Sequence, residues 1–265
     1  MVKNFFDLSG RVALVTGASR GLGQYFGRAL ALAGADLIIT ARRKEDTDEF
    51  AAEIRALGRQ VAGLSLDVRD ETSIRQMAEA AQAAFGRIDI LVNNAGCTVR
   101  KPSLEITWDD WSKVLDTNLR GTFFVTQAVV PHMLARRYGR VINIGSVTSV
   151  SGYAGLAPYC ASRGGVKQLT MSLAAEFGKD GITVNCLAPG WFKTAQNKVM
   201  YEDEAWVEYL CERIPAGRPG LPNDLDGAVV FLASEASVYV TGQTLLVDGG
   251  ISTGAIRALP LQARK

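Results

Sequence analysis

The sequence predicts an α/β protein in which a parallel sheet of about seven strands carries helices on both faces, in a doubly wound arrangement. Short apolar runs rich in β-branched residues alternate with longer segments of helical periodicity. These runs are apolar on both faces, which is typical of strands buried in a parallel sheet. Right-handed crossovers then place helices on both sides of the sheet. A chain of 265 residues is long enough to bury such a core.

The strand candidates are seven short runs, at residues 12–16, 37–40, 61–66, 90–93, 141–144, 182–187 and 244–247. After the first run, Leu22, Phe26, Leu30 and Ala33 recur at near-four spacing, which predicts a helix with one apolar face on the sheet. Gly34 follows them, where a glycine commonly ends a helix. Further helical patterns lie between the strands at 72–85, 108–137 and 164–177, as the βαβ alternation requires.

One segment interrupts this alternation. Residues 191–220 carry three turns with glycine or proline and a group of bulky and charged residues. Because the segment follows a strand directly, we expect it to form a lobe over the functional site. Residues 255–265 are basic and lack periodicity, which fits either a loose tail or an arm on a partner subunit. No repeat or linker divides the chain, so we expect residues 1–265 to form one domain.

The composition is that of an ordinary globular protein. A net charge of +2 is too even to indicate binding to nucleic acid or to an anionic membrane. No apolar run reaches the ~18 residues of a membrane span, and the first residues lack a secretory signal, so we expect a cytoplasmic protein. Cys97, Cys160, Cys186 and Cys211 are far apart, and His132 is the only histidine. Reduced, mostly buried thiols, a structural histidine and no metal site are therefore predicted.

A glycine-rich turn follows the first strand. Residues 16–23 read Thr-Gly-Ala-Ser-Arg-Gly-Leu-Gly and lead into the first helix. Glycines at such a turn let the backbone approach a pyrophosphate, and the helix N-terminus offers unpaired N–H groups to it. Glycines also serve plain turns, but this position between strand and helix favours dinucleotide binding. The spacing is Gly-x-x-x-Gly-x-Gly rather than the more common Gly-x-Gly-x-x-Gly.

From about residue 8 to residue 250 the chain resembles the short-chain dehydrogenase/reductase family. Besides the turn, the matching features are Asp67 after the third strand, Asn-Asn-Ala-Gly at 93–96, and Pro-Gly at 189–190. The resemblance implies a Rossmann-type fold and a nicotinamide cofactor. It implies cofactor contacts from Gly17, Ser19, Arg20, Gly21, Leu22, Gly23, Arg42, Asp67, Val68, Asn94, Ala95, Gly96, Tyr159, Arg163, Pro189, Gly190, Phe192 and Thr194.

The end of the second strand favours NADP(H) over NAD(H). An NAD-preferring site usually has a carboxylate here to bind the ribose hydroxyls, whereas this chain has Ala41. Arg42 follows, and Arg20 lies inside the glycine turn, so two guanidiniums can bracket a 2′-phosphate. The alternative is a solvated helix start in which Arg42 and its basic neighbours pair with the acids at 45 and 46.

The same resemblance implies four catalytic residues, namely Asn118, Ser146, Tyr159 and Arg163. Tyr159 is expected to donate the proton in carbonyl reduction, and Ser146 to orient and polarise the carbonyl. The family has lysine where this chain has Arg163, one helical turn after the tyrosine. Arginine keeps the positive charge and can donate to ribose hydroxyls, but it is too basic to relay a proton. We therefore expect an active enzyme whose turnover is slowed because Arg163 cannot relay protons. Water and the backbone at Asn118 would carry the proton around the Arg163 side chain.

Candidate substrate residues are Cys97, Val147, Thr148, Tyr153, Trp191 and Trp206. The aromatic ones either line a pocket or pack the core of the lobe at 191–220, and Arg100, Lys101 and Lys193 either attract an anionic substrate or are solvated. The segments at 189–194 and 214–218 look similar to the gluconate 5-dehydrogenase-like subgroup, which implies a keto-sugar acid, a polyol or another carbonyl compound as substrate. Reduction of a 3-oxoacyl thioester is the alternative reaction. A catalytically silent NADP(H)-binding sensor or regulator is the alternative of another class, and the resemblance also implies a homotetramer.

Overall fold

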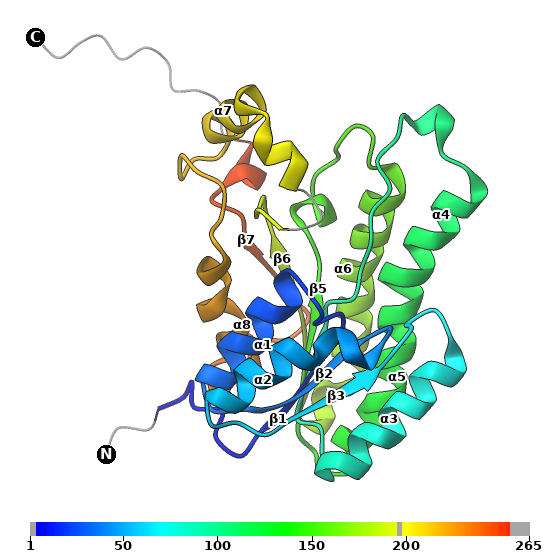
Figure 1. Cartoon of the computed structure of the whole chain (residues 1–265), viewed down its shortest axis with the longest axis vertical. Coiled ribbons are helices and arrows are strands. Elements are labelled where there is room, and N and C mark those ends of the chain that lie inside the picture. Colours follow the sequence, from blue (N-terminus) through cyan, green and yellow to red (C-terminus); the bar gives the residue numbers. More distant parts are fainter. Residues whose placement is uncertain (1–3, 195–197, 255–265) are drawn as a thin grey trace, which may run out of the picture.

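The computed structural model describes residues 4–194 and 198–254, and Figure 1 shows its arrangement. Within these residues seven parallel strands form one sheet in the order β3-β2-β1-β4-β5-β6-β7. The doubly wound parallel sheet predicted from the sequence is therefore confirmed. The strands are β1 (Val12–Val15), β2 (Asp36–Ala41), β3 (Val61–Ser65), β4 (Ile90–Asn93), β5 (Gly139–Ile144), β6 (Ile182–Pro189) and β7 (Thr244–Val247).

Helices cover both faces of this sheet (Figure 1). Those on one face are α1 (Leu22–Leu32), α2 (Asp48–Ala56) and α8 (Asp226–Ala233), and those on the other are α3 (Glu71–Phe85), α5 (Gly121–Leu134) and α6 (Ala157–Phe177). Successive strand residues point to opposite faces, so Val15 packs in the first of these cores and Leu14 in the second. The strand order reverses between β1 and β4, where α/β sheets open a crevice at their carboxyl edge.

Two predicted helices have different bounds in the structure. The pattern at 108–137 is divided into α4 (Trp108–Leu115), the π-helical turn η3 (Asp116–Arg120) and α5. Asn118 lies in the middle of this π turn, and its side chain is fully buried. Helix α6 begins at Ala157, seven residues before the predicted start, because Pro158 lies in its first turn, where proline is tolerated.

The lobe predicted at 191–220 contains the short helix η6 (Lys198–Glu202) and α7 (Glu204–Arg213), both near the carboxyl edge of the sheet (Figure 1). The tail at 255–265 lies outside the described residues. No helix in the described part of the chain is both long and apolar enough to cross a membrane.

Buried charged side chains at the amino edge of the sheet form ion pairs. The fully buried carboxylate of Asp89 accepts hydrogen bonds from the backbone N–H of Val12 (3.0 Å) and from Arg87 (2.7 Å), and Arg136 lies 3.6 Å away. Nearby, the guanidinium of Arg140 is also buried, and the carboxylate of Glu235 lies 3.4 Å from it. Each of these buried charges therefore has a partner of opposite sign.

Candidate active site

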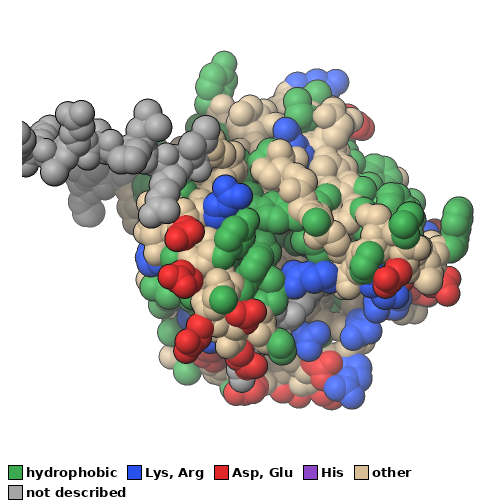
Figure 2. Space-filling model, turned by 90° about the horizontal axis from the view of Figure 1, so that it is seen from above, with side chains coloured by type: hydrophobic (Ala, Val, Ile, Leu, Met, Phe, Trp, Pro, Cys, Tyr) green, Lys and Arg blue, Asp and Glu red, His purple; other side chains and the backbone are tan. Residues whose placement is uncertain are grey.

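A cavity of about 900 Å³ opens at the carboxyl edge of the sheet. Figure 2 looks onto this edge and shows Lys and Arg side chains around a hollow in the surface. Most of the predicted site residues line the cavity. They are Gly17, Ser19, Arg20, Gly21, Leu22, Arg42, Asp67, Val68, Asn94, Ala95, Gly96, Cys97, Ser146, Val147, Thr148, Tyr159, Arg163, Pro189, Gly190, Trp191, Phe192 and Thr194.

Four predicted residues are not among those that line the cavity, namely Gly23, Asn118, Tyr153 and Trp206. Gly23 lies behind the glycine turn, where a Cβ atom would overlap the carbonyl oxygen of Gly17. Tyr153 and Trp206 pack edge-to-face on either side of Trp191, with ring centroids 5.7 and 5.4 Å from it. Of these three aromatic residues only Trp191 reaches the cavity wall, so Tyr153 and Trp206 form the layer behind it.

The glycine turn leaves the N-terminus of α1 open to the cavity. Gly17 and Gly21 have φ angles of +66° and +63°, which residues with a side chain rarely adopt. The Asn94 side chain holds the turn by donating to the carbonyl oxygens of Thr16 (2.9 Å) and Gly17 (3.0 Å). Among the residues described, no side chain caps α1, and its first turn has no acidic residue. The free N–H groups at this end are therefore available to an anion.

Two cations next to the turn lack acidic partners. Arg20 and Arg42 both line the cavity and are exposed, and neither forms a salt bridge with any residue that the structure describes. Their neighbour Arg43 instead pairs with Asp46 at 2.5 Å. The surface pairing considered for this basic segment is thus present for Arg43 and absent for Arg42.

Asp67, which also lines the cavity, forms a bidentate pair with Arg69, at 3.1 and 2.7 Å. These hydrogen bonds hold the pKa of the Asp67 carboxyl below its usual value. Asp67 therefore stays ionised and already neutralises one of the cavity's arginines. Arg69 lines the cavity but was not predicted from the sequence, because its place there depends on its contact with Asp67.

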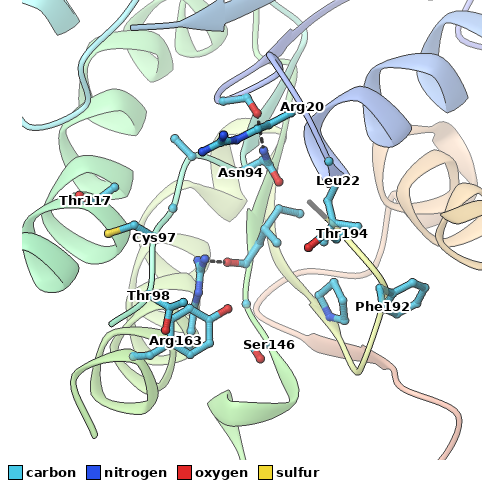
Figure 3. Close-up of a pocket in the computed structure, with 18 of the residues that line it drawn as sticks. Arg20, Leu22, Asn94, Cys97, Thr98, Thr117, Ser146, Arg163, Phe192 and Thr194 are labelled. Carbon is cyan, nitrogen blue, oxygen red and sulfur yellow. Dashed lines mark hydrogen bonds between the residues drawn. The ribbon is translucent and has the colours of Figure 1, made fainter. Parts of the chain in front are cut away.

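Ser146 and Tyr159 lie at the other end of the cavity from Arg20, and Figure 3 shows this separation for Ser146. Ser146 follows β5 by two residues and caps the short helix η4 (Val147–Ser149), where its Oγ accepts the Thr148 N–H at 3.1 Å. Tyr159 lies in the first turn of α6, and its hydroxyl has no hydrogen-bond partner in the part of the chain described. Ser149 joins η4 to α6 by donating to the Arg163 carbonyl oxygen at 2.9 Å.

Arg163 is buried, and its guanidinium is held by β5 rather than by a carboxylate. Its Nη1 donates to the carbonyl oxygen of Ile144 at 2.6 Å, which is one of the hydrogen bonds drawn in Figure 3. The guanidinium carbon lies 5.1 Å from the centre of the Tyr159 ring, within cation–π range. A Cβ atom on Gly96 would come within 2.5 Å of Nη2. Gly96 therefore leaves the space that this larger side chain occupies.

Asn118 clamps the segment that follows β4. Its Oδ1 accepts the Cys97 N–H (2.8 Å), and its Nδ2 donates to the Cys97 carbonyl oxygen (2.9 Å) and to Ser162 Oγ (3.0 Å). The side-chain amide is thus fully used in joining this segment to α6. The carbonyl oxygen of Asn118 accepts the hydroxyl of Thr122 at 2.8 Å.

Further residues line the substrate end without having been singled out as site residues. Met200 and Val199 come from the lobe, and Lys113 and Thr117 come from α4 and η3. Arg100 also lines the cavity and donates to the sulfur of Met200, so the segment after β4 touches the lobe. From the sequence, Arg100 is a candidate contact for an anionic substrate, whereas no local pattern marks the other four residues, which become neighbours only through the fold.

The comparisons with known proteins agree with this geometry. The family model described as "Enoyl-(Acyl carrier protein) reductase" matches residues 17–252. The gluconate 5-dehydrogenase of Gluconobacter oxydans (strain 621H) is 43% identical over 249 residues, which cover 94% of this chain and 97% of that protein. The 3-oxoacyl-[acyl-carrier-protein] reductase of Escherichia coli (strain K12) is 39% identical over 245 residues, with 92% and 98% covered.

A solved structure shares the fold closely. The gluconate 5-dehydrogenase from Burkholderia cenocepacia J2315, in complex with NADP and tartrate, superposes with a TM-score of 0.92 at 44% identity, covering 95% of this chain and 98% of that one. The chain belongs to the short-chain dehydrogenase/reductase family. It is accordingly an oxidoreductase that acts on CH–OH or C=O groups, and within the family it is similar to the gluconate 5-dehydrogenases.

Proposed function

We propose that this protein reduces the ketone of a keto-sugar acid with NADPH, and oxidises the corresponding secondary alcohol in reverse. One observation carries the proposal. Ser146 and Tyr159 line the same cavity as the two unpaired arginines, Arg20 and Arg42, so reacting groups and phosphate-binding groups share one space. Two gluconate 5-dehydrogenases among the relatives, one of them solved with NADP and tartrate, support this choice of substrate and cofactor.

The cavity residues fit NADP(H). The positive φ angles of Gly17 and Gly21 and the uncapped start of α1 form a cradle for a pyrophosphate. At the end of β2, Ala41 offers no carboxylate to repel a 2′-phosphate, whereas Arg42 and Arg20 line the cavity and form no salt bridge with the described residues. NADP(H) is therefore the preferred dinucleotide in this proposal.

In the proposed reaction, the chain's own residues handle the substrate oxygen and its proton. The bound nicotinamide supplies the hydride for the carbonyl carbon. Ser146 Oγ donates a hydrogen bond to the carbonyl oxygen and holds it beside Tyr159, and the Tyr159 hydroxyl gives up its proton as that oxygen becomes an alkoxide. The Thr148 N–H fixes Ser146 Oγ at 3.1 Å and so orients the hydroxyl before substrate arrives.

Arg163 has an electrostatic and positioning role in this proposal. Its buried charge lies against the Tyr159 ring and stabilises the tyrosinate that forms when the proton leaves. The hydrogen bond to the Ile144 carbonyl oxygen fixes that charge in place. An arginine cannot give up a proton in the accessible pH range. Reprotonation of Tyr159 therefore proceeds through water and not through the Arg163 side chain.

The substrate end of the cavity is suited to an anion. Arg100 and Lys113 line it, and no carboxylate pairs with either of them among the residues described. Lys101, in contrast, pairs with Asp110 at 2.6 Å and is already neutralised. A substrate carboxylate can therefore bind near Arg100, with the ketone at Ser146.

The experiment that tests this function is NADPH oxidation with 5-keto-D-gluconate, compared with a 3-oxoacyl thioester and with NADH as cofactor. We expect the keto-sugar acid to be reduced with at least a tenfold higher kcat/KM than the thioester, and NADPH to be preferred over NADH. Higher efficiency with the thioester would favour the other family activity. Tight NADPH binding without turnover of any carbonyl compound would favour a silent NADP(H)-binding sensor. A preference for NADH would contradict the assigned role of Arg20 and Arg42.

The role of Arg163 is tested by Arg163→Lys and Arg163→Met. Lysine restores a group that can relay protons, so we expect turnover to rise several-fold and its pH profile to change between about pH 6 and pH 9. Methionine removes the charge, and turnover should fall at every pH. A change of less than twofold in Arg163→Lys across this range would show that proton relay does not limit the reaction.

A homotetramer in the cytoplasm completes the proposal. Large apolar side chains are exposed along α4 and α5, including Trp108 (86% exposed) and Phe124 (39%), and next to β7, where Tyr239 is fully exposed. Such surfaces are typical of subunit contacts. Light scattering after size exclusion is expected to give four times the mass of the chain, and a monomer would contradict this assembly.

A further inference from the structure

Arg69 is a cavity arginine whose guanidinium is paired along its edge but not covered on its faces. Its Nε and Nη2 donate to the Asp67 carboxylate at 3.1 and 2.7 Å, and its side chain is 43% exposed. Because the donors of a guanidinium lie in its plane, these hydrogen bonds do not occupy its faces. The buried Arg140 and Arg163 lie 4.5 and 5.1 Å from the centres of tyrosine rings, whereas no aromatic ring lies over Arg69 in the described part of the chain.

The turn that carries Arg69 is held in place at several points. The Asp67 carboxylate also accepts the backbone N–H of Arg69 at 3.0 Å. The N–H of Asp67 donates to Ser73 Oγ at 2.9 Å, and Asp70 caps α3 by accepting the N–H of Ser73 at 2.6 Å. The orientation of the Arg69 guanidinium is therefore set before a ligand enters the cavity.

The fold places this turn beside Arg42. Strands β2 and β3 are neighbours, and the N–H of Leu66 donates to the carbonyl oxygen of Ala41 at 2.7 Å, so the residues that follow the two strands leave the sheet side by side. Arg42 follows β2 and Arg69 follows β3, whereas Ser146 follows β5 on the other side of β1. A dinucleotide with its pyrophosphate at the start of α1 and its nicotinamide at Ser146 therefore has its adenosine at the ends of β2 and β3.

We propose that Arg69 binds the adenine ring of the cofactor by stacking the face of its guanidinium on the base. The inference rests on the proposed binding of NADP(H) and names a residue that holds the base rather than the phosphates. Adenine supplies the ring that Arg69 lacks, and arginine suits such a contact because its guanidinium is planar and weakly hydrated. Asp67 is then a positioning residue, since it fixes the plane of the guanidinium and offsets its charge. The 2′-phosphate is left to Arg20 and Arg42, which have no acidic partner in the described structure.

Equilibrium binding of NADP⁺ and NAD⁺, measured by isothermal titration calorimetry, tests this role without turnover. Both dinucleotides contain adenine, so Arg69→Ala is expected to raise the two Kd values by the same factor, about 2- to 30-fold, the range of a cation–π contact. A contact with the 2′-phosphate would instead raise only the Kd for NADP⁺. Arg69→Lys separates the two roles even where NADP⁺ is the only ligand titrated. Lysine keeps the charge beside Asp67 but has no plane to stack, so it should recover little of the loss.

Arg87→Ala is the matched control. Arg87 likewise pairs with an aspartate two residues away, Asp89, at 2.7 Å, and its side chain is 39% exposed. It lies at the amino edge of the sheet and is not among the residues that line the cavity. This variant also breaks an arginine–aspartate pair, but it should leave both Kd values within twofold of those of the wild type.

The outcomes distinguish the inference from the function beneath it. If the wild-type protein binds neither dinucleotide, the proposed function fails and the inference fails with it. If the wild type binds NADP⁺ and Arg69→Ala keeps its Kd, only the inference is overturned. A rise confined to NADP⁺, or a wild-type Kd in Arg69→Lys, would assign Arg69 to the phosphate and would also overturn stacking on the base. Equal losses in Arg69→Ala and Arg87→Ala would overturn it as well, since they would reflect lost stability rather than a lost contact.

Discussion

The two edges of the sheet differ in whether their charged side chains are paired with groups of opposite charge. At the amino edge, Asp89 is enclosed by Arg87 and Arg136, and the buried Arg140 lies beside Glu235. At the carboxyl edge, Arg20 and Arg42 have no acidic partner in the described structure, and the guanidinium of Arg163 is bound only to a backbone carbonyl. The first arrangement stabilises the native state by itself. The second leaves positive charge available to phosphate, carboxylate and tyrosinate groups, so binding capacity is concentrated at one edge.

The strongest test of this difference is Tyr159→Phe at the carboxyl edge. Removal of the proton donor is expected to lower kcat by about 10²–10⁴-fold, the usual contribution of general acid catalysis. The melting temperature should hardly change, because the Tyr159 hydroxyl has no partner within the described residues. Steady-state kinetics and thermal melting check the two expectations.

Tyr138→Phe provides the comparison at the amino edge. The Tyr138 ring packs under the guanidiniums of Arg11 and Arg140, with ring-centre distances of 3.8 and 4.5 Å. This variant should keep wild-type turnover. If both tyrosine variants lost turnover to the same degree, the separation of function between the two edges would be wrong.

At the amino edge, Asp89→Ala should be the most destabilising of the single changes considered. It leaves the buried N–H of Val12 without this acceptor and the guanidinium of Arg87 without its carboxylate. An unsatisfied buried N–H costs about 1–3 kcal/mol of unfolding free energy. Loss of the pairs with Arg87 and Arg136 adds less, because those side chains are 39% and 29% exposed. Urea denaturation measures this loss, and turnover per folded molecule should stay at the wild-type value.

Asp180→Asn is the matched control for Asp89→Ala. Asp180 is paired with Arg137 at 3.6 Å, and the Arg137 side chain is 70% exposed. Exposed pairs contribute about 0–1 kcal/mol, so little stability should be lost. A loss comparable to that of Asp89→Ala would mean that burial is not what makes the amino-edge pairs stabilising.

Arg42→Ala tests the unpaired cations directly. We expect KM for NADPH to rise about 10- to 100-fold through loss of a charge-assisted contact with the 2′-phosphate, while KM for NADH changes less than twofold. Arg43→Ala is the control, because Arg43 is the next residue and is already paired with Asp46. If Arg42→Ala changed KM for NADPH and for NADH equally, Arg42 would not bind the 2′-phosphate.

Features encoded by local pattern were predictable from the sequence. The buried strands follow from continuous apolar runs, and the glycine turn follows from residues that need positive φ angles, as Gly17 and Gly21 do. Ser146 and Tyr159 were found through the spacing of a known family, and both line the cavity. In these cases the relevant information lies within a few residues, or within an interval that the fold keeps constant.

Features that depend on tertiary neighbours were not predictable. The π turn at Asn118 interrupts a pattern that reads as one long helix, and the Asn118 amide is used by Cys97 and Ser162 rather than by the cavity. That the buried Thr148 Oγ1 has no hydrogen-bond partner among the described residues is visible only once its neighbours in the fold are known. The placement of Tyr153 behind Trp191 likewise depends on how the lobe packs.

The smallest expected effect concerns Asp110, which is paired with Lys101. Asp110 accepts hydrogen bonds from Lys101 (2.6 Å) and from the N–H of Thr107 (3.1 Å), which lowers its pKa to about 2. Since this value lies below the ~3.9 of an unfolded aspartate, the pair stabilises the native state above about pH 4, and this contribution is lost as the pH falls toward 2. Asp110→Asn should therefore have a slightly lower urea midpoint than the wild type at pH 7. The difference should narrow below about pH 4, and a difference that does not depend on pH would show that the carboxylate charge at Asp110 is not its source.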